Sequence, residues 1–168
     1  GTNGMKFSTS WPSSDLEMME QSVDDYIENE QFHAYYMTFS GHGPYSTANP
    51  IAVKNIKKVR ELLGDRDLKD AAEYYLAANY ELELAMEYLV NRLEEAGKLD
   101  KTMIVITGDH YPYYLNDSAL QSIAGEKVEK NLHLPQLVGK ENVLEFQMKG
   151  GDVMVLKFFL KEDVNGNV

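Results

Sequence analysis

The sequence predicts an α/β domain built around a mainly parallel sheet, and three patterns point to this fold class. Two short runs rich in aromatic or β-branched residues, Phe32 to Phe39 and Met103 to Ile106, are typical of buried strands. The residues between them have the apolar spacing of helices, so strand, helices and strand follow one another as in a βαβ unit. The last part of the chain adds the signal of a C-terminal β-hairpin.

Composition narrows the class of protein. The chain has 168 residues with 43% hydrophobic content, which is enough for a single domain with a sizeable core. A formal net charge of -11 argues against nucleic acid as a partner, since phosphates would be repelled. There is no cysteine, so any metal must be bound by oxygen and imidazole ligands. No apolar run approaches the roughly 20 residues that span a bilayer, and we expect any membrane anchor to lie outside this sequence.

The first predicted element is an amphipathic helix over about residues 14 to 29. Ser14 and Glu17 have the spacing of a capping box. The apolar positions that follow have helical spacing and are Leu16, Met19, Val23, Tyr26 and Ile27. Trp11, the single tryptophan, lies just before this helix. It either packs on the helix start or contacts a ligand.

The strand over Phe32 to Phe39 ends at the turn Ser40-Gly41-His42-Gly43-Pro44-Tyr45. A glycine on each side of His42 leaves its ring accessible. A lone histidine is often structural, but ligands of open α/β sheets gather at the carboxyl ends of strands, where His42 lies. Both interpretations therefore stay open for His42.

Two helices are predicted before the next strand. Residues 54 to 63 form a short helix that Gly64 ends, and a longer helix runs from about Leu68 towards Gly97. The apolar positions of the longer helix recur every three or four residues and are Leu68, Ala71, Tyr75, Ala78, Leu82, Ala85, Leu89 and Leu93, with Glu and Arg expected on the opposite face.

Gly108-Asp109-His110 follows the second strand at its carboxyl end. A carboxylate beside an imidazole is half of a plausible metal site, although neighbouring residues of a strand point to opposite faces. Both can face one ion only if the backbone turns, which Gly108 and Pro112 make reasonable. A right-handed crossover would bring the two strand ends to one edge of the sheet, and His42 towards Asp109 and His110.

The rest of the chain predicts a helix over Asp117 to Glu129 and then a hairpin. Its strands are Val143 to Met148 and Val153 to Leu160, which flank Gly150 and Gly151.

Three of these segments together carry a family resemblance. The run from Tyr35 to Tyr45, the long helix, and Thr102 to Tyr113 resemble the C-terminal part of the sulfatase-like catalytic domain of the lipoteichoic acid synthase and phosphoglycerol transferase family. The resemblance covers about residues 5–130, and residues 131–168 diverge from it. It implies a partial alkaline-phosphatase-like α/β/α sandwich, with this chain as a single domain that is a fragment of a larger one. It also implies a catalytic domain on the extracellular face of the bacterial cell membrane.

The resemblance implies a role for each candidate residue. Asp109 and His110 match metal ligands for Mn²⁺ or another divalent ion, and His42 matches a histidine that contacts the phosphoglycerol group. Trp11 is the expected substrate-side tryptophan. The implied partners are a phosphatidylglycerol-type lipid head group and a glycerol phosphate polymer, and the implied reaction builds a lipoteichoic-acid-like polymer of the cell envelope.

This chain departs from the family pattern upstream of Trp11. The family's nucleophilic threonine and an acidic metal ligand precede that position by a long stretch, and no such segment is present in this sequence. We therefore expect no catalytic nucleophile in this fragment and no activity from it alone. Two ligands are also fewer than the roughly four to six that zinc or manganese prefers, so we expect weak or absent metal binding.

Two other functions remain open. One is a sister activity of the sulfatase superfamily, either a phosphoethanolamine transferase or a true sulfatase, because Gly-Asp-His is common to several branches. The other is a non-catalytic binding module that keeps the sheet without the nucleophile. In either case half of a sheet leaves an exposed edge, which favours homo-oligomers of the fragment.

Overall fold

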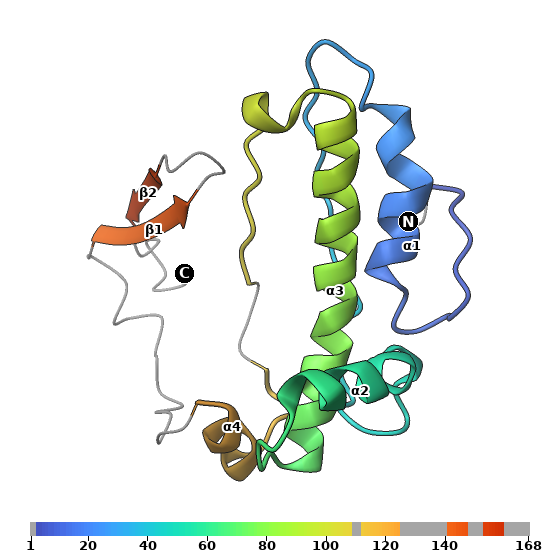
Figure 1. Cartoon of the computed structure of the whole chain (residues 1–168), viewed down its shortest axis with the longest axis vertical. Helices are drawn as coiled ribbons and strands as arrows, with labels where there is room; N and C mark the ends of the chain where they lie inside the picture. Colours follow the sequence, from blue (N-terminus) through green and yellow to red (C-terminus); the bar gives the residue numbers. More distant parts are fainter. Residues whose placement is uncertain (1–2, 109–111, 125–140, 148–152, 160–168) are drawn as a thin grey trace, which may run out of the picture. The chain divides into compact units, whose positions relative to one another are not determined.

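The computed structural model divides the chain into two compact units, Gly1–Lys127 and Val128–Val168. The residues that the structure describes are 3–108, 112–124, 141–147 and 153–159. Within these residues, helices and extended segments belong to the first unit and a pair of strands to the second (Figure 1).

The first unit is helical in its described part. Its elements are α1 (Asp15–Ser22), η1 (Val23–Asp25), α2 (Pro50–Leu63), α3 (Asp70–Glu95), η2 (Leu99–Lys101) and α4 (Asp117–Ala124), where η1 and η2 are short 3-10 helices. The long helix α3 contacts α1, α2 and α4, and Figure 1 shows it running through the middle of the helical part. It is therefore the common packing partner of the other three α-helices.

The start of α1 confirms the predicted cap. The Ser14 hydroxyl accepts a hydrogen bond from the Glu17 N–H at 3.1 Å. The Glu17 carboxylate does not complete the box, because it accepts the N–H of Ser8 at 2.9 Å instead. The predicted continuation to residue 29 is wrong: α1 ends at Ser22 and gives way to η1 and a turn.

The two middle helices are close to their predicted positions. Helix α2 begins at Pro50, before the predicted residue 54, because the Asn49 side chain accepts the N–H groups of Ile51 and Ala52 at 3.0 Å each. It ends at Gly64, whose φ of 59° lies in the left-handed region that favours glycine.

The core consists of three apolar clusters that share α3. Small residues dominate its buried face, where Ala72, Ala77, Ala78 and Ala85 have no exposed surface. Larger side chains come from the neighbouring segments and include Met19 of α1, Val23 and Ile27 after it, Ile51 and Val59 of α2, and Leu115 before α4. Burying one such large side chain contributes about 1.5–3 kcal/mol, so these clusters are the main source of stability.

The predicted parallel sheet is wrong. Residues 32–39 and 102–108 are extended, but neither pairs with another strand within the described residues of the first unit. Phe32, Tyr36 and Ile104 pack on the core cluster shared by α1 and α3, but Ala34, Thr38 and Ile106 are exposed, so the inward positions do not alternate. Tyr35 and Met103 are 80% and 65% exposed. The fold is therefore not an α/β/α sandwich: the aromatic and β-branched composition of these runs favours an extended backbone, but a ladder also needs a second strand alongside.

The described part of the second unit is a β-hairpin-like pair of strands. Strand β1 (Glu141–Gln147) pairs antiparallel with β2 (Val153–Phe159), from Glu141 opposite Phe159 to Gln147 opposite Val153. The predicted antiparallel pair is thus confirmed, with bounds shifted by one or two residues. The predicted Gly150-Gly151 turn lies outside the described residues, as does the predicted extension of α4 to residue 129.

In the part of the chain that the structure describes, no helix combines the length and apolar character needed to cross a membrane.

Candidate functional site

His42 lies in a tight turn at the end of the extended segment 32–39. Its N–H donates to the Phe39 carbonyl at 3.0 Å, and its own carbonyl accepts from the Asn49 side-chain amide at 2.9 Å. The Tyr45 hydroxyl donates to the Gly41 carbonyl at 3.0 Å, which closes the turn from its other end. The backbone that carries His42 is therefore held on both sides.

The imidazole of His42 has a defined tautomer. Nδ1 lies 2.9 Å from the Gly43 carbonyl, and a carbonyl oxygen only accepts, so Nδ1 carries a hydrogen. Nε2 is consequently the nitrogen that remains for a ligand. It accepts a proton in the neutral form and donates in the protonated form, which are the two states useful at a phosphate.

Two aromatic rings flank this imidazole. The Trp11 ring centroid lies 4.8 Å from that of His42 and 5.6 Å from that of Phe39, both edge-on. The second ring comes from a later part of the chain: the centroid of the Tyr114 ring lies 6.1 Å from that of His42 and 6.3 Å from that of Tyr45. Trp11 is 51% exposed and Tyr114 is 65% exposed, so both rings border the imidazole while remaining open to solvent.

The glycines beside His42 have specific packing reasons. A Cβ at Gly43 would lie 2.6 Å from the Tyr114 ring, and a Cβ at Gly41 would lie 2.9 Å from the side-chain oxygen of Asn79. Any larger residue at position 43 would push Tyr114 away from the imidazole. The Gly-His-Gly pattern thus serves close packing here as well as backbone freedom.

A buried carboxylate holds the backbone just before this turn. Asp15 is 1% exposed, and its two oxygens accept the N–H of Phe39 at 2.7 Å and the N–H of Ser40 at 3.2 Å. The Ser40 hydroxyl also donates to it. Burial raises the pKa of Asp15 above its ordinary value of 3.8, and the hydrogen bonds from Ser40 and Phe39 oppose that rise.

Glu81 of α3 is a second buried carboxylate, close enough to Asp15 for its charge to act on it. It accepts from the Lys54 ammonium at 2.9 Å, from the Asn55 amide at 2.8 Å and from the Ser14 hydroxyl. Burial by itself would raise the pKa of Glu81. The hydrogen bonds outweigh burial, so that pKa lies below its ordinary value of 4.5.

The predicted metal ligands Asp109 and His110 lie outside the described residues. Their predicted approach to His42 therefore stays a prediction, as do the assigned roles of Trp11 and His42. The described residues that flank Asp109 and His110 in the sequence are Gly108 and Pro112, and Tyr114, two residues after Pro112, packs on Gly43. Among the described residues, no group of three or more His, Asp or Glu side chains is placed to hold a metal ion.

Sequence reasoning missed Asp15, Glu81 and Tyr114. Glu81 had a usable signal, because it lies three residues after Ala78 and four before Ala85, on the apolar face of the long helix rather than the expected opposite face. Asp15 had none beyond its place in a helix first turn. Tyr114 was one of 11 tyrosines with nothing to distinguish it.

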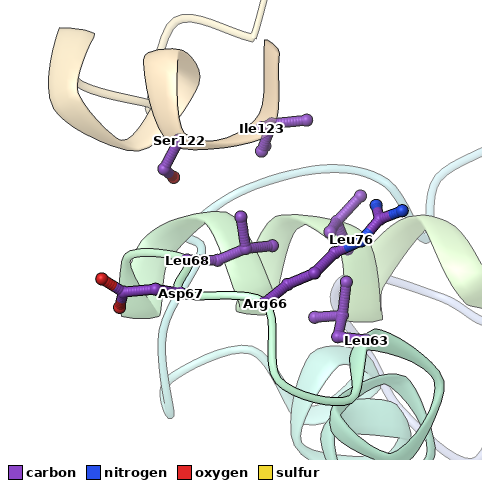
Figure 2. A pocket seen from close by; sticks show the side chains of 7 residues that line it. All are labelled: Leu63, Arg66, Asp67, Leu68, Leu76, Ser122 and Ile123. Carbon is purple, nitrogen blue, oxygen red and sulfur yellow. The ribbon is translucent and has the colours of Figure 1, made fainter. Parts of the chain in front are cut away.

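A cleft of about 450 Å³ lies elsewhere, between the end of α2, the start of α3 and α4 (Figure 2). Figure 2 shows the leucines Leu63, Leu68 and Leu76 gathered below Ile123 and Ser122 of α4. Arg66 and Asp67 also line it. It carries no histidine and no nucleophile beyond the Ser122 hydroxyl, so the His42 turn remains the better candidate site.

Comparison with known proteins gives two relatives and one family model. Residues 98–168 match a family described only as a domain of unknown function (DUF4488), which is under half of the chain. No solved structure matches the chain significantly.

The two relatives carry related names. The lipoteichoic acid synthase-like protein YvgJ of Bacillus subtilis (strain 168) is 31% identical over 105 residues, which is 62% of this chain and 16% of that protein. The lipoteichoic acid synthase of Staphylococcus saprophyticus is 29% identical over 116 residues, 68% of this chain and 17% of that protein. The chain thus spans about one sixth of the length of these relatives. Over about two thirds of its own length, it is similar to lipoteichoic acid synthases.

Proposed function

We propose that this chain is the C-terminal part of a metal-dependent phosphoglycerol transferase that acts on phosphatidylglycerol and builds a lipoteichoic-acid-like polymer at the extracellular face of the bacterial cell membrane. The observation that carries the proposal is the partly buried imidazole of His42, which contacts the rings of Trp11 and Tyr114. Similarity to two lipoteichoic acid synthase relatives supports it.

The turn supplies groups suited to a phosphoglycerol ligand. Protonated His42 donates from Nε2 to a phosphoryl oxygen, while its Nδ1 hydrogen stays on the Gly43 carbonyl and fixes the ring. The faces of Trp11 and Tyr114 offer apolar surface to the carbon chain of glycerol. Recognition of phosphoglycerol then combines one charged hydrogen bond to the phosphate with contacts from two aromatic rings to the glycerol.

We assign Asp109 and His110 as two ligands of a divalent ion such as Mn²⁺. Carboxylate oxygen and imidazole nitrogen are donor types that such ions accept. When bound, the ion would neutralise charge on the phosphoryl group. The described residues add no cluster that completes the site, so further ligands must come from other residues. The attacking hydroxyl is likewise not assigned to any threonine of this chain.

Metal binding by this chain alone is expected to be weak. Two protein ligands leave most positions of a divalent ion to water, which lowers affinity. Calorimetric titration with Mn²⁺ measures this directly. Micromolar or tighter binding that disappears in Asp109→Ala would contradict the expectation.

Ligand recognition by the turn can be tested on the chain itself. Trp11 is the only tryptophan, so its fluorescence reports events at His42. We expect sn-glycerol 1-phosphate to change this fluorescence saturably, and we expect His42→Ala to lose the response because the phosphate donor is gone. His33→Ala is the matched control, since His33 is an exposed histidine outside the turn. A fluorescence response in His42→Ala equal to that of the unaltered chain would contradict the proposal.

The non-catalytic binding module is the second candidate. One observation favours it: an imidazole in contact with the rings of Trp11 and Tyr114 can bind a ligand without any chemical step. A binding module would retain the fluorescence response, while transfer by the longer protein would be unaffected by His42→Ala. A phosphoethanolamine transferase would instead respond to phosphoethanolamine in preference to glycerol phosphate.

A further inference from the structure

One buried side chain, Asp15, connects the segment that carries Trp11 with the segment that carries His42. Asp15 lies four residues after Trp11 on the same segment. Its carboxylate accepts the backbone N–H groups of Phe39 and Ser40, which immediately precede the turn that carries His42. The segment with the tryptophan and the segment with the histidine are therefore joined through a single carboxylate.

The hydrogen-bonding partners explain why this junction is specific. All three groups that face the two oxygens of Asp15 are donors, namely two backbone N–H groups and the Ser40 hydroxyl. Only a side chain that accepts hydrogen bonds at both of these positions satisfies the three donors. The site is 1% exposed, so water does not readily replace a lost acceptor.

The contacts then lead outward to the functional groups. Phe39, held by Asp15 through its N–H, accepts the His42 N–H on its carbonyl at 3.0 Å. The Phe39 ring also packs edge-on against Trp11 at 5.6 Å. A shift of Phe39 would thus move both its contact with Trp11 and the backbone position of His42.

We propose that Asp15 is a positioning residue that sets the ring contact between His42 and Trp11. Its effect on substrate rests on the proposed function of His42, whereas its effect on geometry does not. Asn at this position fits poorly, because either orientation of its amide points an NH₂ donor at another donor. The expected consequence is a displaced turn in a protein that is still folded.

The test is an NMR measurement on the full 168-residue chain without ligand. Protons of the His42 ring lie close to the indole and should show a ring-current displacement in a spectrum of histidine-labelled protein. His42→Ala assigns the signal among the four histidines, and Trp11→Leu shows how much displacement the indole causes. We expect Asp15→Asn to lose that displacement while far-ultraviolet circular dichroism stays unchanged.

The matched control is Glu81→Gln, which alters an equally buried carboxylate that contacts the helices but not residues 39–42. It is expected to lower stability and keep the His42 displacement. If Asp15→Asn does not fold, Ser40→Ala removes one of the three donors and is expected to weaken the displacement. An unchanged His42 signal in the folded Asp15 variant, or in Ser40→Ala if the former does not fold, would overturn the proposal. A failure of glycerol phosphate binding would instead count only against the proposed function.

Discussion

Replacing Glu81 with alanine is expected to lower the free energy of unfolding by about 3 kcal/mol. The carboxylate is fully buried and accepts from Lys54 and Asn55 of α2 and from Ser14, the N-cap of α1. Removal of one partner from a buried pair costs about 3–5 kcal/mol, but Lys54 is half-exposed and can regain water, so the lower end applies. Urea unfolding at pH 7 measures the change, and a loss below about 1 kcal/mol, typical of exposed pairs, would contradict it.

The same network predicts a dependence on pH. Because the folded-state pKa of Glu81 is lowered, its contribution is present above the ordinary carboxyl value of 4.5 and is lost as pH falls through the lowered pKa. Asp15 acts in the opposite sense, since its raised pKa gives a contribution that is present at low pH and lost as pH rises. Comparison of the parent with Glu81→Gln tests the first effect, together with the smaller change at Asp15, whose pKa the charge of Glu81 helps to raise. The gap between them should narrow in acid, and a constant gap would exclude the ionised state of Glu81 as its source.

Replacing His42 with alanine is expected to lower phosphoglycerol transfer by roughly 10²- to 10³-fold in the longer protein, as removal of one donor to transition-state charge does. Nε2 is the nitrogen left for the phosphate, because Nδ1 is committed to the Gly43 carbonyl. Release of diacylglycerol from a labelled phosphatidylglycerol analogue measures the rate. Turnover equal to that of the His33→Ala control would remove His42 from the mechanism.

The helices could be predicted because their signals are local. Ser14 as an N-cap and the Gly64 stop are short-range features that act within one turn, whereas the Asn49 cap before Pro50 is just as local but was missed. The end of α1 was misplaced because Tyr26 and Ile27 continue the apolar pattern, although they pack from the turn after η1. Periodicity identifies which residues face the core, and it does not require that they do so from a helix.

The sheet was mispredicted because strand pairing is not local. Tyr36 and Ile104 pack on the core from segments outside any helix, in runs whose composition is typical of strands. That composition says nothing about which segment lies alongside, and within the described residues of the first unit none pairs with either run. In contrast, β1 and β2 are close in sequence, and a short connection is enough to specify an antiparallel partner.

The candidate site was predicted in part. A histidine between two glycines marked the turn, but its neighbours depended on tertiary contacts that no spacing encodes. Asp15 reaches Ser40 across 25 residues, and Tyr114 meets Gly43 from a different segment altogether. Asp109 and His110 lie outside the described residues and remain predictions.

The alanine-rich face of α3 limits which substitutions the core of this protein can accept. Four of its buried positions carry only a methyl group, and three other helices pack on this element. Glycine at those positions weakens the helix by about 1 kcal/mol, and any larger side chain pushes two backbones apart. A leucine or isoleucine on a neighbour, in contrast, can exchange for another side chain of similar size. We therefore expect the smallest side chains of the core to be its least replaceable.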